Sequence, residues 1–299
     1  MIYYLFILLA VLAFTLQFVL TKLFSAAART GGITALCMLL AIGLAGALVA
    51  LAASGFSLHL SGASLLLAVI FAAIMIPYHT LGVKALALGD LTVYSVFMML
   101  GGMLLPFLYG ILLLDEGASV GKLCGCVLLT VGIALQGMCQ GKGKSEQKAG
   151  AMYLVLCCII FVVNGLGGII SQIHALRTDT VDEISFIFFS SLLTAFLAIA
   201  GLVPLLIRGG ATARLECKSF FAPKPFLLAT MLGAMMNIGN YLILLAAPHV
   251  GASVQFPLIS GGTILASAAA SFLIFGERPA RKELWALLII LLSTVLFAF

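Results

Sequence analysis

Two long stretches without a single charged residue constrain this chain more than any other feature of its sequence. Residues 30–83 and 225–276 contain no Lys, Arg, Asp or Glu. Each stretch is too long for one helix across a bilayer, which needs about 20 apolar residues. Each also contains a turn-like segment, at 54–62 and at 247–253. We therefore predict that each stretch forms two membrane-spanning helices joined by an uncharged turn.

The composition supports the same conclusion for the rest of the chain. Of its 299 residues, 64% are hydrophobic and 8% are charged, whereas a soluble domain carries roughly a quarter charged residues. So few polar side chains cannot cover a globular surface in water, but a lipid bilayer accepts an apolar exterior. The composition therefore excludes a water-soluble fold and predicts an integral membrane protein.

Six further uncharged stretches each have the length of one span, so the sequence predicts an all-α membrane protein with ten transmembrane helices. The predicted spans are 2–24, 33–53, 64–88, 91–114, 122–140, 150–176, 184–207, 225–247, 250–275 and 284–299.

The positions of the basic residues predict the orientation. Of 15 Lys and Arg, only Lys122 and Arg177 fall in loops after even-numbered spans. The others follow odd-numbered spans: Lys22, Arg29, Lys84, Lys142, Lys144, Lys148, Arg208, Arg214, Lys218, Lys224, Arg278, Arg281 and Lys282. Short loops rich in Lys and Arg stay in the cytoplasm. We therefore predict a multi-pass protein of the cell membrane with both termini outside the cytoplasm.

An internal repeat relates the two halves of the chain. Residues 85–140 align with 246–299 at an offset of 161 residues, and the aligned pairs include Ala85 with Ala246, Thr92 with Ser253, Gly101 with Gly262 and Glu116 with Glu277. The same offset aligns His79 with Asn240, and an offset of 147 aligns Gln17 with Asn164. We predict a first repeat over 1–140, a basic linker over 141–149 and a second repeat over 150–299.

Each repeat holds five spans. Because five is an odd number, the second repeat begins on the opposite side of the membrane and is inverted relative to the first. Inverted repeats recur in secondary transporters, where two halves expose one midplane site to each side of the membrane in turn. The predicted architecture is therefore that of a transporter.

The sequence resembles the drug/metabolite transporter superfamily in its ten-helix form with two EamA-type repeats. The resemblance covers almost the whole chain and is carried by residues 18–22 near the end of the first span, by residues 85–86, and by the Glu116 and Glu277 loops. The chain departs from the family at Phe14, where members often have Trp-Gly-Ser, and at Ile264, where they often have Pro. Many relatives also keep both termini in the cytoplasm. The resemblance implies alternating access, with export as the default direction.

Seven polar side chains lie near the middle of predicted spans: Gln17, Tyr78, His79, Asn164, Asn237, Asn240 and Tyr241. Polar side chains inside a bilayer cost free energy and usually face a bundle interior or a wet cavity. The last three share one face of a helix because they are spaced i, i+3 and i+4. We predict that the seven line a substrate-binding cavity. The alternative is that they only hold neighbouring helices together by hydrogen bonds.

We therefore predict a secondary transporter that moves a small organic solute, such as a metabolite, amino acid or drug-like molecule. Its cavity is expected between the first, third, fourth, sixth, eighth and ninth spans. An intramembrane enzyme or lipid-handling protein that uses the same polar cluster is the competing interpretation, and an assembly subunit without a cavity is a third.

We expect no catalytic site, cofactor, metal or nucleic-acid partner, and the small-molecule substrate and the lipid bilayer are the predicted partners. The segment 117–121 matches a Gly-x-Ser-x-Gly string, but that catalytic motif requires a strand-turn-helix and a His partner. The cysteines and histidines lack metal-ligand spacing.

Overall fold

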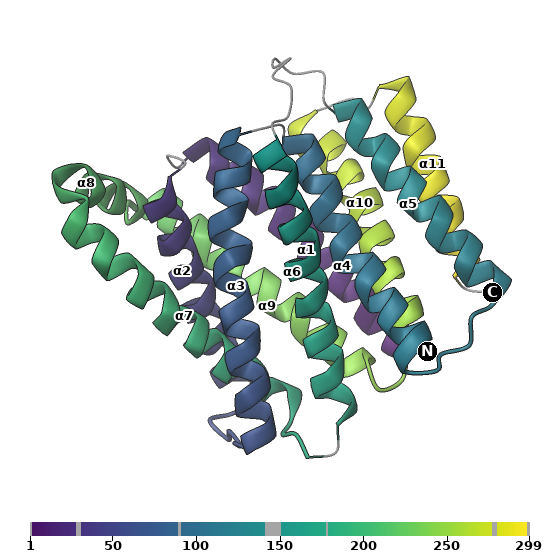
Figure 1. Ribbon diagram of the computed structural model, residues 1–299, viewed down its shortest axis with the longest axis horizontal. Coiled ribbons are helices and arrows are strands. Elements are labelled where there is room, and N and C mark those ends of the chain that lie inside the picture. The colour runs from purple at the N-terminus through teal and green to yellow at the C-terminus, as the bar shows by residue number, and fades with distance from the viewer. Residues whose placement is uncertain are drawn as a thin grey trace.

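The computed structural model describes residues 2–27, 31–88, 91–140, 151–177, 179–276 and 280–297, which form a bundle of helices (Figure 1). The predicted linker 141–149 and Glu277 lie outside the described residues. The helices are α1 (Ile2–Ala27), α2 (Gly32–Ala53), α3 (Gly62–Leu88), α4 (Leu91–Leu113), α5 (Val120–Gln140), α6 (Ala151–Leu176), α7 (Glu183–Arg208), α8 (Gly210–Phe220), α9 (Pro223–Ala246), α10 (Ala252–Phe275) and α11 (Arg281–Leu296).

Ten of these helices coincide with the predicted spans, with ends that agree to within three residues. Both uncharged turns are present, one between α2 and α3 and the other between α9 and α10. Gly55 and Phe56 adopt positive φ angles of 58° and 66° in the first turn, which reverses the chain there. The exception is α8, which lies between the predicted spans 184–207 and 225–247, where no helix was predicted.

Eight of the helices are long and apolar enough to cross a membrane. They are Ile2–Phe24, Gly32–Ala53, Gly62–Gly82, Val96–Leu113, Ala151–Leu176, Glu183–Arg208, Pro223–Ala246 and Ala252–Phe275. The α5 helix carries a shorter apolar segment, Val120–Gln136, and α11 has only 16 residues and begins with Arg-Lys-Glu. The many apolar helices indicate a multi-pass membrane protein.

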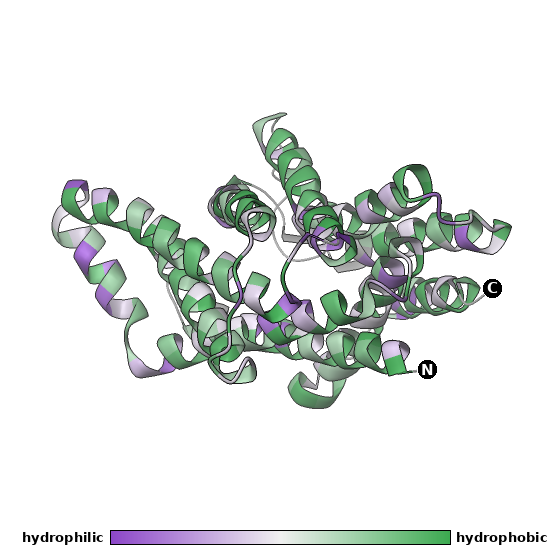
Figure 2. Cartoon of the chain, turned by 90° about the horizontal axis from the view of Figure 1, so that it is seen from below, coloured by the Kyte–Doolittle hydropathy of each residue, from purple (hydrophilic) through white to green (hydrophobic). Residues whose placement is uncertain are grey.

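The outer faces of the helices are apolar as well. Leu48, Leu112 and Val127 are each more than 60% exposed, and Figure 2 shows long hydrophobic helices with hydrophilic residues concentrated near helix ends and along α8. Apolar side chains on the outer surface are unfavourable in water but favourable in the hydrocarbon core of a bilayer. The fold thus presents the exterior expected of a protein in lipid.

The principal contacts join helices of residues 2–140 to helices of residues 151–297. The α1 helix packs on α9 and α10, α2 on α7 and α9, α3 on α6 and α7, α4 on α6 and α10, and α5 on α11. The two ends of the chain lie near the same edge of the molecule in Figure 1. Packing within each half is less extensive, so the core forms mainly between the halves.

Close approach of α2 and α7 depends on glycine. A Cβ added at Gly43 would lie 2.7 Å from the backbone oxygen of Ser191, so a larger residue would push the helices apart. This approach brings the polar residues in the middle of α7 and α9 next to α2.

Candidate functional site

A small polar space lies between α2, α3, α7 and α9. The space available to a water molecule has a volume of about 20 Å³, enough for about one water molecule. Three of the predicted residues line it, namely His79, Asn237 and Asn240. The other lining residues are Leu39, Ile42, Gly43, Phe71, Met75, Ser191, Thr194 and Met236. We call this space the polar chamber.

The Asn237 side chain is buried and fixed by hydrogen bonds to three helices. Its Nδ2 donates to the carbonyl oxygens of Gly233, at 2.9 Å, and Ile42, at 3.4 Å, while its Oδ1 accepts from Ser191 Oγ at 3.2 Å. A Cβ at Gly46 would lie 2.5 Å from both Asn237 Nδ2 and Ser191 Oγ. Gly46 therefore leaves the room that this network occupies.

His79 supplies an unpaired polar atom at the chamber. Its Nε2 is buried and has no hydrogen-bond partner among the described residues, while its ring contacts Tyr78 edge-on at a centroid distance of 4.9 Å. A buried polar atom without a partner is costly, so this nitrogen is available to a water molecule or a solute. Asn240 lies at the same chamber and has no hydrogen bond of its own to the described residues.

The chamber is lined by neutral side chains. Its polar groups are an imidazole, two amides and two hydroxyls, and its apolar lining includes two methionines and Phe71. Such a set donates and accepts hydrogen bonds without fixing a charge. The arrangement suits a small polar group with an apolar neighbour, the usual composition of small-molecule sites.

The other predicted residues lie elsewhere. Tyr241 borders a separate apolar space of about 120 Å³, on another side of Asn237. Asn164 donates from Nδ2 to the carbonyl oxygen of Met98 at 2.7 Å and so joins α6 to α4. Gln17 and Tyr78 line neither space. The structure thus brings three of the seven residues to one chamber, and the substrate-binding role of all seven stays a prediction.

The chamber also involves helices that were not expected. The prediction placed the cavity between the first, third, fourth, sixth, eighth and ninth spans, whereas α2 and α7 contribute several lining residues. Ser191 and Thr194 are the polar residues that sequence reasoning missed. Their i, i+3 spacing on an apolar helix was the available signal, but hydroxyl groups in helices often bond only to their own backbone. Thr194 Oγ1 does so, donating to the oxygen of Ser190 at 2.7 Å.

Glu116 caps a helix of the other half of the chain. Its carboxylate accepts hydrogen bonds from the backbone nitrogens of Ala252, at 2.7 Å, and Ser253, at 2.8 Å. It also accepts from Ser253 Oγ, which in turn receives a hydrogen bond from Lys122 Nζ at 3.2 Å. A negative charge at a helix N-terminus is stabilising because the first amides are unpaired there. The loop 114–119 is therefore fastened to the start of α10.

Ser64 and His174 form the arrangement closest to a catalytic pair. Ser64 Oγ lies 3.0 Å from His174 Nε2, but it also accepts from the backbone nitrogen of Val181 at 2.9 Å. Both side chains are 1% exposed, and His174 Nδ1 has no partner among the described residues. A nucleophile-base pair needs access to substrate and a third group to orient the base. We therefore assign this pair to packing between α3, α6 and the loop before α7.

Asp182 fastens the loop before α7. Its carboxylate accepts from the nitrogen and the hydroxyl of Ser185, both at 3.0 Å, and it lies 3.2 Å from His59 Nδ1. Partial burial raises the pKa of this carboxyl, but the hydrogen bonds from Ser185 and His59 outweigh it and hold the pKa below its ordinary value. The charged form of Asp182 thus stabilises the start of α7.

The described residues contain no group of three or more His, Cys, Asp or Glu that could hold a metal ion. The thiols of Cys37 on α2 and Cys217 on α8 come closest to a soft-metal pair, with sulfurs 3.9 Å apart. Two ligands do not complete the tetrahedral set typical of zinc.

Comparison with known proteins supports the fold. No family model matches the chain, and no curated protein matches it. A solved crystal structure matches with a TM-score of 0.75 at 16% sequence identity, and the match covers 99% of this chain and 98% of the other. The chain therefore shares an entire fold with that protein, and at this identity the likeness concerns the fold alone.

Proposed function

We propose that the chain is a secondary transporter of the drug/metabolite transporter superfamily, moving a small organic solute across the cell membrane by alternating access. The polar chamber is the observation that carries this proposal. It lies between helices of both halves of the chain. The imidazole nitrogen Nε2 of His79 and the side-chain amide of Asn240 lie at this chamber without a hydrogen-bond partner among the described residues. Polar groups inside a membrane bundle typically mark a substrate or ion path.

The proposal includes ten spans in two inverted repeats, over 1–140 and 150–299. The pattern of helix contacts supports it: exchanging α1 with α6, α2 with α7, α3 with α9, α4 with α10 and α5 with α11 converts the principal contacts into one another. For example, the contact of α1 with α9 becomes that of α6 with α3. Two halves that pack by equivalent contacts can exchange conformations, which is how such transporters expose one site to each side in turn.

The chamber favours a neutral solute. The side chains that line it carry no fixed charge, with His79 as the only titratable one, so an ion would lose its hydration without gaining a counter-charge. The present volume holds about one water molecule, so the proposed cycle requires α2, α3, α7 and α9 to separate when solute enters. The orientation predicted from the basic loops, with both termini outside the cytoplasm, is part of the proposal.

Uptake into proteoliposomes tests this function. Purified protein is screened by thermal shift against amino acids, nucleosides and organic anions, and the stabilising solutes are offered in radiolabelled form. We expect time-dependent accumulation that His79→Ala and Asn240→Ala reduce at least tenfold. His249→Ala is the matched control, because His249 is exposed, stacks on Tyr3 and is not among the residues that line the chamber.

The outcome also separates the competing functions. Chemical conversion of a lipid or peptide substrate without accumulation would replace the transporter by an intramembrane enzyme. Normal solute accumulation by both His79→Ala and Asn240→Ala would show that the solute does not pass through the chamber. Loss of folding in both variants, without any specific loss of uptake in folded protein, would favour an assembly subunit.

A further inference from the structure

The short helix α8 has two chemically distinct faces. Residues spaced i, i+3, i+4 and i+7 line its inner face, namely Ala213, Glu216, Cys217 and Phe220, and all of them are buried or half-buried. The outer face carries Ala211, Arg214, Leu215 and Lys218 at the same spacing, and all four are exposed. This is the pattern of an amphipathic helix.

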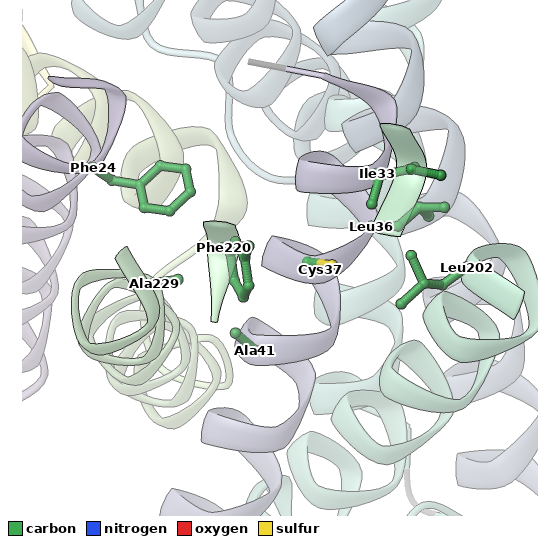
Figure 3. Close-up of a cluster of buried hydrophobic side chains, with 9 residues drawn as sticks. Phe24, Ile33, Leu36, Cys37, Ala41, Leu202, Phe220 and Ala229 are labelled. Atoms are coloured by element: carbon green, nitrogen blue, oxygen red, sulfur yellow. The ribbon is translucent and has the colours of Figure 1, made fainter. Parts of the chain in front are cut away.

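The inner face packs on the core of the bundle. Phe220 is 1% exposed and contacts the ring of Phe24 edge-on, with centroids 6.0 Å apart. Figure 3 shows Phe220 between residues of α1, α2 and α9, among them Ala41 and Ala229. The helix is therefore fixed in place, and its outer face has a defined direction.

The acidic residue of α8 is directed away from the outer face. The carboxylate of Glu216 accepts from the backbone nitrogen and the hydroxyl of Thr34, both at 3.0 Å, at the N-terminus of α2. A Cβ at Gly31 would collide with this carboxylate. Glu216 is thereby engaged by α2 and does not neutralise the basic residues on the other side of α8.

The basic residues near α8 are exposed and make no hydrogen bond or ion pair within the described part of the chain. They are Arg208, Arg214, Lys218 and Lys224. Two large apolar side chains lie beside them, Leu215 at 64% and Phe221 at 50% exposed. The α8 helix runs from the end of α7 to the start of α9, at one end of the molecule (Figures 1 and 2). Because both neighbours are candidate spans, α8 lies where the chain leaves the bilayer.

We propose that the outer face of α8 binds anionic phospholipid headgroups, with Leu215 and Phe221 inserted at the boundary of the acyl chains. Basic side chains next to apolar ones on an interfacial helix match the layers of a charged membrane surface. Arg214 and Lys218 lie one turn apart and can contact the same headgroup region. This inference depends on the chain being a membrane protein and not on what it transports.

Local hydrogen exchange in nanodiscs tests the proposal. Wild-type protein is placed in phosphatidylcholine alone and in phosphatidylcholine with about 30 mol % phosphatidylglycerol, where each basic residue at the surface adds about fivefold to the affinity. We expect the anionic lipid to slow amide exchange in residues 211–221 at least fivefold. The R214Q/K218Q variant should lose this effect, whereas R214K/K218R should keep it.

The matched control is R281Q/K282Q, which removes two exposed basic side chains at the start of α11 and should leave the lipid effect on α8 intact. Equal exchange of α8 in both lipids would overturn the proposal. So would a lipid effect that persists in R214Q/K218Q at high and low salt, since charge would then not be its cause.

Discussion

Glu116 and Ser253 join the two halves of the chain, with a carboxylate oxygen of Glu116 lying 2.8 Å from the backbone nitrogen of Ser253. Glu116 follows the C-terminal end of α4, and Ser253 lies in the first turn of α10. The Glu116 side chain therefore links the C-terminal end of α4 to the N-terminal end of α10. In an alternating-access cycle, this contact would have to break when that end of the bundle opens.

Glu116→Ala should destabilise the protein. The substitution leaves the first amides of α10 without an acceptor, at a cost of about 1–2 kcal/mol in the free energy of unfolding. The measurement is the apparent Tm in detergent. Asp115→Asn is the control, because the neighbouring Asp115 is exposed and should tolerate the change. Equal Tm values for wild type and Glu116→Ala would show that this contact contributes nothing.

Gly46→Ala should displace side chains that line the polar chamber, although Gly46 itself does not line it. The added methyl group would collide with Asn237 and Ser191, and such overpacking costs about 1–3 kcal/mol. We expect a lower Tm together with reduced solute transport. Gly32→Ala in the same helix is the control, since its Cβ would meet no other atom within 4 Å. A variant as stable as wild type would contradict the packing described for α2, α7 and α9.

Asn237 and Asn240 should behave differently when replaced by Ala. Asn237 makes three hydrogen bonds, and its removal leaves buried partners unpaired at about 1–3 kcal/mol. Asn240 has no hydrogen bond to the described residues, so its loss should lower transport and leave the Tm nearly unchanged. Tm and uptake measured on the same preparations distinguish the two. Similar Tm losses in both variants would place Asn240 in a structural network.

Acid should weaken the start of α7 through Asp182. Because its pKa is lowered in the folded protein, the carboxylate stabilises the fold fully above the unfolded value of about 3.9 and loses this effect as pH falls through the lower folded value. Asp182→Ala should therefore lower stability at neutral pH and flatten the decline in stability below about pH 4. Tm is measured against pH, with Asp115→Asn as the control. An unchanged acid profile would exclude Asp182 as its source.

Mild oxidation should cross-link α2 to α8. The sulfurs of Cys37 and Cys217 lie 3.9 Å apart, so copper-phenanthroline, which removes two electrons and two protons, should join them as a disulfide. Mass spectrometry of the digested protein should detect the Cys37–Cys217 peptide pair, and Cys217→Ser should abolish it. Cross-links of Cys37 to the exposed Cys124 or Cys158 would contradict the placement of α8.

Hydropathy and charge predicted most of the fold, because a membrane span needs a length of apolar residues that is visible in the sequence. Ten helix positions follow from that rule. The α8 helix does not, since its 11 residues carry Arg214, Glu216 and Lys218 and are stabilised by packing of Phe220 against the bundle. A short amphipathic helix of this kind cannot be separated from a polar loop by composition.

The candidate site was predicted only in part. Placing His79, Asn237 and Asn240 near mid-depth required only the sequence, but which polar groups meet depends on helix rotation and on partners in distant segments. Asn164 is bonded to the backbone of Met98, and Ser191 turns toward Asn237. Neither contact leaves a local pattern, so neither could be read from spacing.

Alternating access requires the chamber to open to each side of the membrane in turn, and chemical labelling from each side measures this directly. An Asn240→Cys variant in proteoliposomes is treated with a membrane-impermeant maleimide added outside or trapped inside, and the labelled peptide is identified by mass spectrometry. We predict labelling of position 240 from both sides, slowed by the transported solute. Labelling from neither side, while a cysteine introduced at the exposed loop residue Asp115 reacts normally, would contradict alternating access through this chamber.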